Sequence, residues 1–208
     1  MKVIGILGGV ASGKSFVADC FRELGAATLD GDRIGHEVLR TAEVEQAARD
    51  RWGDAIFDDE GHIDRRELAK AVFKDGANGQ DASEELAFLE SLTHERIGQR
   101  LAAEAEQLRQ ASGHPAAIID AAVLLKAGWD HLCDSIIFVE VPEDIRKQRA
   151  VDRGWAPSEL ARREQSQLPL EAKRQRADTI IDNSQDRETT RRQVRQYWAS
   201  MVESGRND

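Results

Sequence analysis

Cysteines and long apolar runs are both scarce in this chain. Its 208 residues include only two cysteines, Cys20 and Cys133, whereas a secreted disulfide scaffold would use more. We therefore expect buried, inert thiols and a cytoplasmic protein. No apolar run approaches the roughly 18 residues of a membrane-spanning helix, and the run from Val3 to Leu7 is too short for the core of a signal peptide. The sequence predicts no association with a membrane.

Positive charge is also in short supply. The chain has 29 lysine and arginine residues against 38 aspartate and glutamate residues, which gives a net charge of −9. So acidic a chain is not expected to bind nucleic acid or an anionic membrane surface. An anionic small ligand is still compatible with this composition where basic residues gather locally.

The apolar residues that are present, 40% of the chain, fall into short continuous runs. Such runs lack the alternation of half-exposed strands and are typical of parallel strands that are buried on both faces. Helical patterns lie between most of them, an order that predicts a doubly wound α/β sheet. The five expected strands are KVIGIL (2–7), AATLD (26–30), AAIID (116–120), SIIFVEV (135–141) and DTIID (178–182).

Two stretches interrupt this alternation of strands and helices. Residues 61–112 are charged and helix-rich, and they are too many for a plain crossover, so we expect an inserted helical domain there. Residues 145–176 hold nine basic and four acidic side chains. A mobile lid that closes over phosphates would have this charge, and so would a solvated basic face. The nucleotide-binding core would then comprise residues 1–60, 113–144 and 177–208.

The segment GGVASGKS matches the pattern G-x-x-x-x-G-K-[ST] of a phosphate-binding loop. Glycines allow successive N–H groups to point inward, and the helix that follows directs the positive end of its dipole at the bound anion. Lys14 is expected to reach the β- and γ-phosphates, and Ser15 to place its hydroxyl on Mg²⁺. The loop predicts ATP and Mg²⁺ as cofactors, with nucleotide contacts from Gly8, Gly9, Val10, Ala11, Ser12, Gly13, Lys14, Ser15 and Phe16.

Acidic residues at the ends of expected strands favour a kinase. A GTPase would need a guanine-reading N-K-x-D motif, which the chain lacks. Asp30 and Asp32 follow the second strand, at the carboxyl edge of the sheet beside the phosphate loop, where α/β sheets bind ligands. A carboxylate there can accept the proton of an attacking hydroxyl, although Asp32 could instead be a helix N-cap. Asp120 ends the third strand and could orient Mg²⁺ through water.

These motifs together resemble the dephospho-coenzyme A kinase family over nearly the whole chain. The loop is similar to the family's GGIGSGKS, and LDGD is similar to its D-A-D segment. The inserted stretch WGDAIFDDEGHIDRRELAKAVF (52–73) resembles a family signature, and Gln167 falls where the family has a lid glutamine. LESLTHERI (89–97) and ADTIIDN (177–183) resemble two further family segments.

The resemblance implies a P-loop kinase fold of three layers, with a five-stranded parallel sheet, a helical acceptor-binding domain and a helical lid. It also implies an enzyme of the last step of coenzyme A synthesis. The γ-phosphoryl group of ATP would pass to the ribose 3′-hydroxyl of dephospho-CoA, the small-molecule partner. The catalytic residues would be Asp32, Lys14 and Arg149.

Further site residues follow from the same resemblance and from helical spacing. Arg149 and Arg153 are four residues apart, so one helix face would present both to the ligands. The acceptor would be bound by Asp32, Arg65, His94 and Arg153, although His94 could be a purely structural histidine. Asn183 could contact the adenine of ATP or cap the next helix.

The chain departs from the family pattern at three places. Lys126 stands where the family has glutamate, in a segment that has also lost its proline. Ala11 replaces a loop glycine, which is tolerable if φ there is negative, and Phe16 leaves Ser15 without a second hydroxyl beside it. Two alternatives therefore stay open: another P-loop small-molecule kinase, and a regulator that binds ATP without catalysis.

Overall fold

The computed structural model describes residues 1–73 and 82–204. The chain divides into two compact units: Met1–Asp30 together with Ala102–Asp208, and Gly31–Leu101. The second unit includes most of the stretch 61–112 that the sequence analysis expects to be an inserted helical domain. None of the helices in the described part of the chain is long and apolar enough to cross a membrane.

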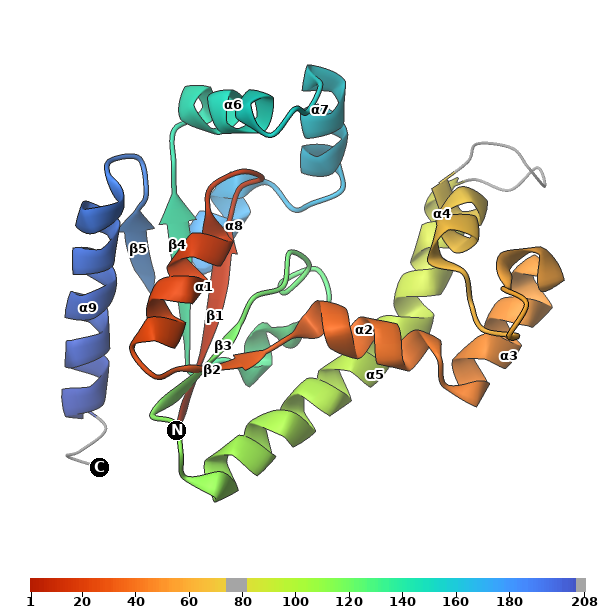
Figure 1. The fold of residues 1–208 in the computed structure, drawn as a ribbon, viewed down its shortest axis with the longest axis horizontal. Coiled ribbons are helices and arrows are strands. Elements are labelled where there is room, and N and C mark those ends of the chain that lie inside the picture. Colours follow the sequence, from red (N-terminus) through yellow and green to blue (C-terminus); the bar gives the residue numbers. More distant parts are fainter. Residues whose placement is uncertain (74–81, 205–208) are drawn as a thin grey trace. The chain divides into compact units, whose positions relative to one another are not determined.

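The first unit contains a five-stranded parallel sheet with the order β2-β3-β1-β4-β5 (Figure 1). All five expected strands are present, so the α/β prediction is confirmed. The central strand β1 lies between β3 and β4, and most of its side chains are fully buried, which is why its sequence is continuously apolar. The strands are β1 (Lys2–Gly8), β2 (Ala27–Leu29), β3 (Ala116–Ile119), β4 (Ser135–Glu140) and β5 (Thr179–Asp182).

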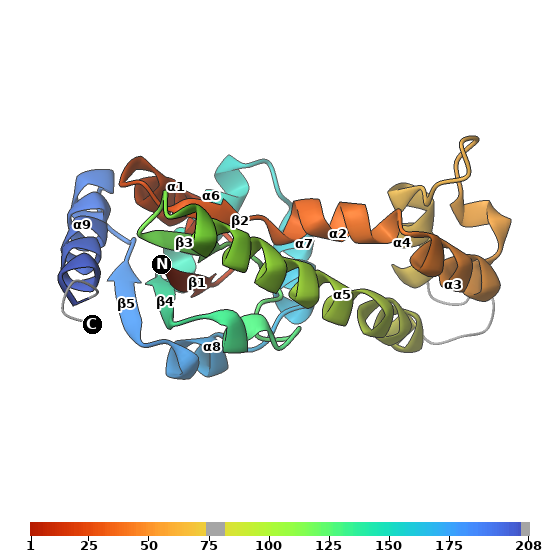
Figure 2. The same cartoon turned by 90° about the horizontal axis from the view of Figure 1, so that it is seen from below.

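Helices cover both faces of this sheet. Helices α1 (Lys14–Glu23) and α9 (Arg187–Ser204) pack on one face, and α8 (Leu170–Arg176) lies against β1 and β4 on the other, as Figures 1 and 2 show together. Phe21 of α1 and Val194 of α9 share a fully buried cluster with apolar side chains of four strands. The three-layer arrangement is therefore as expected.

Two further helices connect β4 to α8. They are α6 (Glu143–Asp152) and α7 (Pro157–Gln165), which pack against each other. Ala150 of α6 and Leu160 of α7 form a small buried cluster with Val10 and Ala11, two residues of the loop after β1. This apolar contact holds the basic segment directly against the loop. A short 3₁₀ turn, Trp129–Leu132, precedes β4.

The second unit is helical. It contains α2 (Gly31–Leu39), α3 (Ala42–Trp52), a 3₁₀ turn at Asp54–Ile56, α4 (Arg65–Phe73) and the first two thirds of α5 (Ala82–Ala111).

A buried carboxylate ties α3 to α5. Glu85 accepts hydrogen bonds from the guanidinium of Arg51 at 2.8 Å and from the indole N–H of Trp52 at 2.6 Å. The hydrogen bond from Arg51 is the main reason that the pKa of Glu85 lies below its usual value. Because the buried carboxylate of Glu85 is satisfied by these two donors, we interpret the cluster as structural.

Candidate functional site

The phosphate loop connects β1 to α1, and two of its glycines are required by close contacts. A Cβ on Gly8 would lie 3.0 Å from the carbonyl oxygen of Val139 and 2.6 Å from Oγ of Ser12. Gly13 has a φ of +86°, in the left-handed region, and a Cβ there would clash with Nδ2 of Asn183. The loop can therefore approach the ends of the neighbouring strands only because these positions lack side chains.

Lys14, the first residue of α1, folds back over the loop. Its Nζ donates a hydrogen bond to the carbonyl oxygen of Gly9 at 3.2 Å. Burial lowers the pKa of Lys14, with Arg153 and Arg146 acting in the same direction, whereas Asp120 opposes them. The ammonium group thus lies in a site where positive charge is already in excess.

The condition under which Ala11 would replace glycine without strain, a negative φ, is not met. Ala11 has a φ of +60°, a conformation that is unfavourable for a residue with a Cβ. Its methyl group is buried, at 7% exposure, against Ala150 and Leu160. Packing against the α6 and α7 helices therefore compensates, at least in part, for the backbone strain that glycine would avoid.

Arg149 and Asn183 form hydrogen bonds with the end of the loop that leads into α1. The guanidinium of Arg149 donates to the carbonyl oxygens of Ser12, at 3.3 Å, and Asn183, at 2.8 Å. Nδ2 of Asn183 donates to the same Ser12 oxygen at 2.8 Å, while its Oδ1 accepts from the hydroxyl of Thr190 at 2.9 Å. Asn183 is only 5% exposed, so both polar ends of its side chain are used inside the protein.

The alternative of a helix N-cap is wrong for both Asn183 and Asp32. Asp186 caps α9, since its carboxylate accepts from the backbone N–H of Thr189 at 2.7 Å, and Asn183 lies further upstream. Asp32 lies inside the first turn of α2, after its first residue, Gly31.

Two buried polar atoms at the loop have no hydrogen-bond partner among the residues that the structure describes. They are Oγ of Ser12 and Nε of Arg146. Arg146, which is 4% exposed, donates through Nη1 to the carbonyl oxygen of Val10 at 3.4 Å and pairs with Glu164. Buried polar groups are almost always satisfied by protein or water, so these two donors are available to water or to a polar ligand at the loop.

A cleft of about 300 Å³ opens beside these donors. Its lining comprises Gly9, Val10, Glu143, Arg146, Glu164, Gln167, Leu168, Pro169, Leu170 and Lys173. Burial, together with the charges of Lys14 and Arg146, lowers the pKa of Lys173 to about 8. The cleft therefore brings the cationic groups of Arg146 and Lys173 to the phosphate loop, with the carboxylates of Glu143 and Glu164 also in its lining.

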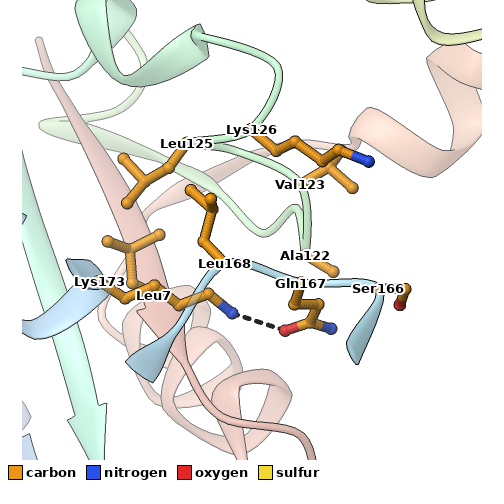
Figure 3. A pocket seen from close by; sticks show the side chains of 9 residues that line it. All are labelled: Leu7, Ala122, Val123, Leu125, Lys126, Ser166, Gln167, Leu168 and Lys173. Carbon is orange, nitrogen blue, oxygen red and sulfur yellow. Dashed lines mark hydrogen bonds between the residues drawn. The ribbon is translucent and has the colours of Figure 1, made fainter. Parts of the chain in front are cut away.

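A smaller cavity of about 10 Å³, room for roughly one water molecule, lies under the segment that departs from the family pattern. Ala122, Lys126, Gln167 and Lys173 are among its lining residues (Figure 3). In Figure 3 the ammonium of Lys173 faces the amide oxygen of Gln167, whereas the ammonium of Lys126 points away from that pair.

Candidate metal ligands lie on either side of the loop. Ser15 is exposed at the start of α1, and Asp120 directly follows β3, the neighbour of β1. Across residues 1–73 and 82–204, no group of three or more histidine, cysteine, aspartate or glutamate side chains is arranged to hold a metal. Asp30 does lie at the carboxyl edge of the sheet, but β3 separates its strand, β2, from β1.

The remaining predicted site residues belong to the second unit or have other contacts. Asp32, Arg65 and His94 belong to the second unit: Asp32 and Arg65 are exposed in the first turns of α2 and α4, and His94 is half-buried in α5. Arg153 ends α6, with its guanidinium 5.6 Å from the ring centre of Trp155. The ring of Phe16 packs on the core beneath two arginines of α9.

Comparison with known proteins decides the family. The sequence profile of the dephospho-CoA kinases matches residues 2–188. A dephospho-CoA kinase from Aquifex aeolicus is 36% identical over 203 residues, which cover 97% of this chain and 98% of its relative. The chain belongs to the dephospho-CoA kinase family. Another dephospho-CoA kinase, from Corynebacterium diphtheriae, is 33% identical over 208 residues, covering 98% of this chain and all of that protein.

Solved structures share the fold of this chain. A crystal structure of a Thermus thermophilus protein superposes with a TM-score of 0.75 at 28% identity, covering 96% of this chain and 97% of that one. A dephospho-CoA kinase from Campylobacter jejuni, with 20% identity and the same coverage, gives 0.63 and shows that the fold is shared. The family is enzymatic, so the predictions of a kinase and a P-loop kinase fold are confirmed.

Sequence reasoning missed three residues of the loop's surroundings. Arg146 lies one helical turn before Arg149, and this spacing could have indicated a shared helix face. Lys173 and Thr190 gave no such signal, because their contacts with Gly8 and Asn183 depend on how α8 and α9 pack.

Proposed function

We propose that this chain transfers the γ-phosphoryl group of ATP to the 3′-hydroxyl of the ribose of dephospho-CoA and releases coenzyme A and ADP. Relatives of 33 and 36% identity that match along the whole chain are named dephospho-CoA kinases, and this is the observation on which the proposal rests. The cleft at the loop, with its buried unpartnered donors, supports the binding of phosphate groups.

The reaction needs positive charge at the nucleotide and a base at the acceptor. The bond between the γ-phosphorus and the bridging oxygen of ADP breaks, a bond to the 3′-oxygen forms, and the hydroxyl proton passes to the carboxylate of Asp32. Charge in the loose transition state spreads over the phosphoryl oxygens and the leaving ADP. Lys14 and Arg149 stabilise that charge from fixed positions, so little reorganisation accompanies the reaction.

The acceptor would be held by the helical unit and the basic segment. Arg65, His94 and Arg153 are the proposed contacts, with residues 61–112 as the acceptor domain and residues 145–176 as a lid that excludes water. Residues 1–60, 113–144 and 177–208 form the nucleotide-binding core in this proposal. We also propose a cytoplasmic location, which is consistent with the free thiols of Cys20 and Cys133.

Mg²⁺ fits the oxygen donors at the loop. The hydroxyl of Ser15 and, through water, the carboxylate of Asp120 are the residues that would hold it, because this ion takes few protein ligands and keeps waters and phosphate oxygens. Asp120 is close enough to Lys14 to raise its pKa, which places a negative charge next to the phosphate site. Bound there, the ion supplies neutralising charge to the β- and γ-phosphate oxygens.

A coupled assay of ADP release with dephospho-CoA as acceptor tests the proposal. ATP-dependent ADP release, with coenzyme A identified by mass spectrometry, is the expected result. Turnover with a nucleoside or sugar but not with dephospho-CoA would assign another small-molecule kinase. Tight ATP binding without turnover of any acceptor would favour the non-catalytic regulator instead.

A further inference from the structure

Two lysines from different helices contact consecutive carbonyl groups of the phosphate loop. Nζ of Lys14 lies 3.2 Å from the carbonyl oxygen of Gly9, and Nζ of Lys173 lies 3.4 Å from that of Gly8. Lys173 also donates to Oε1 of Gln167 at 2.6 Å (Figure 3). Their helices, α1 and α8, lie on opposite faces of the sheet.

The ammonium of Lys173 is buried, and one of its three N–H groups is available to a ligand. The side chain is 3% exposed, and the described residues provide acceptors for two of its three N–H groups, at Gly8 and Gln167. Its neighbours Lys14 and Arg146 are cations, and Nε of buried Arg146 is also unpartnered. The carboxylate of Glu164 pairs with Arg146 and offsets only part of the positive charge around Lys173, since the pKa of Lys173 is still lowered.

This positive charge lies at one end of the loop. Arg149 and Asn183 contact Ser12, at the end that leads into α1. Arg146 and Lys173 instead contact Val10 and Gly8, on the side to which the ammonium of Lys14 points. In loops of this pattern the lysine reaches the β- and γ-phosphates while backbone N–H groups cradle the α- and β-phosphates.

We propose that Lys173 binds the γ-phosphate, the group that is transferred, and that Gln167 positions its ammonium for this contact. The inference rests on the proposed function, since it takes ATP as the nucleotide. Lys173 would then act with Lys14 as a second ammonium ligand, delivered by the basic segment. Because the contact involves only the terminal phosphate, it distinguishes ATP from ADP.

Isothermal titration calorimetry of Lys173→Met with two nucleotides tests this assignment. Methionine keeps the length and apolar body of the side chain and removes the charge. We expect affinity for the β,γ-imido analogue of ATP to fall about 10- to 100-fold, the loss of one charge-assisted hydrogen bond. Affinity for ADP should change by less than about 3-fold, since ADP lacks the phosphate concerned.

Arg174→Gln is the matched control. It removes one positive charge from the next position of α8, where Arg174 pairs with Glu140 at the surface, and it should leave both affinities unchanged. Equal losses for the two nucleotides in Lys173→Met, or no loss for either, would overturn the assignment. If that variant fails to fold, Gln167→Leu provides a second test, because it removes only the acceptor of the ammonium. It should likewise lower the affinity for the imido analogue more than the affinity for ADP.

The two proposals fail separately. Wild-type protein that binds the imido analogue but does not phosphorylate dephospho-CoA refutes the proposed function, while the two affinities of Lys173→Met still decide the role of Lys173. Normal turnover of dephospho-CoA in wild type, with equal nucleotide affinities in wild type and variant, refutes the role of Lys173 alone.

Discussion

Replacing Asn183 with alanine should destabilise the phosphate loop without changing the preference between adenine and guanine nucleotides. The side chain joins β5 to the loop through Ser12 and to α9 through Thr190, and both hydrogen bonds are buried. The sequence analysis expected Asn183 to contact adenine or to cap a helix. The bracing contacts predict a different phenotype from adenine recognition, so the two can be separated.

The magnitude follows from the contacts that are lost. Each buried hydrogen bond contributes about 1 kcal/mol, and an unsatisfied partner raises the loss. The carbonyl of Ser12 keeps a longer bond from Arg149, and the hydroxyl of Thr190 keeps a weak one to the carbonyl of Asp186 at 3.5 Å. We therefore expect Asn183→Ala to lower the free energy of unfolding by about 2–3 kcal/mol, a decrease in Tm of about 5–10 °C for a chain of this size.

Differential scanning calorimetry and nucleotide titrations together decide the matter. Thr190→Val removes only one of the two bonds and should cost about 1 kcal/mol. In Asn183→Ala, affinities for ATP and GTP should fall by a common factor, because the defect lies in the loop that holds their phosphates. Stability within about 0.5 kcal/mol of wild type, combined with a changed ratio of ATP to GTP affinity, would refute the bracing role and restore the adenine contact.

Four further substitutions have defined outcomes. Asp32→Asn should keep ATP binding but lower the rate at least about 100-fold, as for a lost general base; near-normal turnover would remove Asp32 from the mechanism. Lys14→Ala should weaken both ATP binding, by titration, and turnover. Ala11→Gly should change the free energy of unfolding by less than about 1 kcal/mol, because relief of about 1–2 kcal/mol of strain opposes the lost methyl packing and the added freedom of the unfolded chain. Lys173→Met should raise Tm of the nucleotide-free protein at pH 7, where the buried ammonium is still charged.

Lys173 makes a contribution of defined sign to the pH dependence of wild-type stability. Burial and two nearby cations hold its folded-state pKa at about 8, below the 10.5 of an exposed lysine. Between these values the unfolded chain binds more protons, so this group makes stability rise with pH in that window. Comparison of urea unfolding at pH 7.5 and 9.5 for wild type and Lys173→Met isolates the contribution, which the variant should lack. A wild-type gain that the variant retains would assign the effect to other groups.

The fold was largely predictable from the sequence because its signals are local. Buried parallel strands must be apolar along their whole length, so the five runs located β1 to β5 to within a residue or two. The phosphate loop was equally visible from its pattern, and close contacts with Ser12, Val139 and Asn183 explain the glycines at Gly8 and Gly13. The sequence indicated the second unit only as a break in the alternation of strands and helices. Its start at Gly31 depends on tertiary packing, which the sequence pattern does not reveal.

The contacts around the loop were not predictable, since each depends on tertiary packing. The positive φ of Ala11 is tolerated where α6 and α7 cover its methyl group, a contact between residues far apart in the chain. Asn183 follows β5, and its partners were set by the strand order that brings β5 near the loop. Lys173 is one of nine basic residues in its segment, and only the fold distinguishes it from the exposed ones.

Burial of three cationic side chains at the phosphate loop is electrostatically unfavourable when no nucleotide is bound. Lys14, Arg146 and Lys173 lie against loop carbonyls, burial lowers the pKa of both lysines, and nearby positive charge lowers it further. Removing cations from water costs free energy that an anion between them recovers. A triphosphate would therefore stabilise the loop together with α6 and α8, which hold two of these cations. Since any group that binds only the folded state stabilises it by an amount that grows with its affinity, the Tm increase on adding the imido analogue should exceed that from ADP at the same free concentration, and Lys173→Met should reduce this difference.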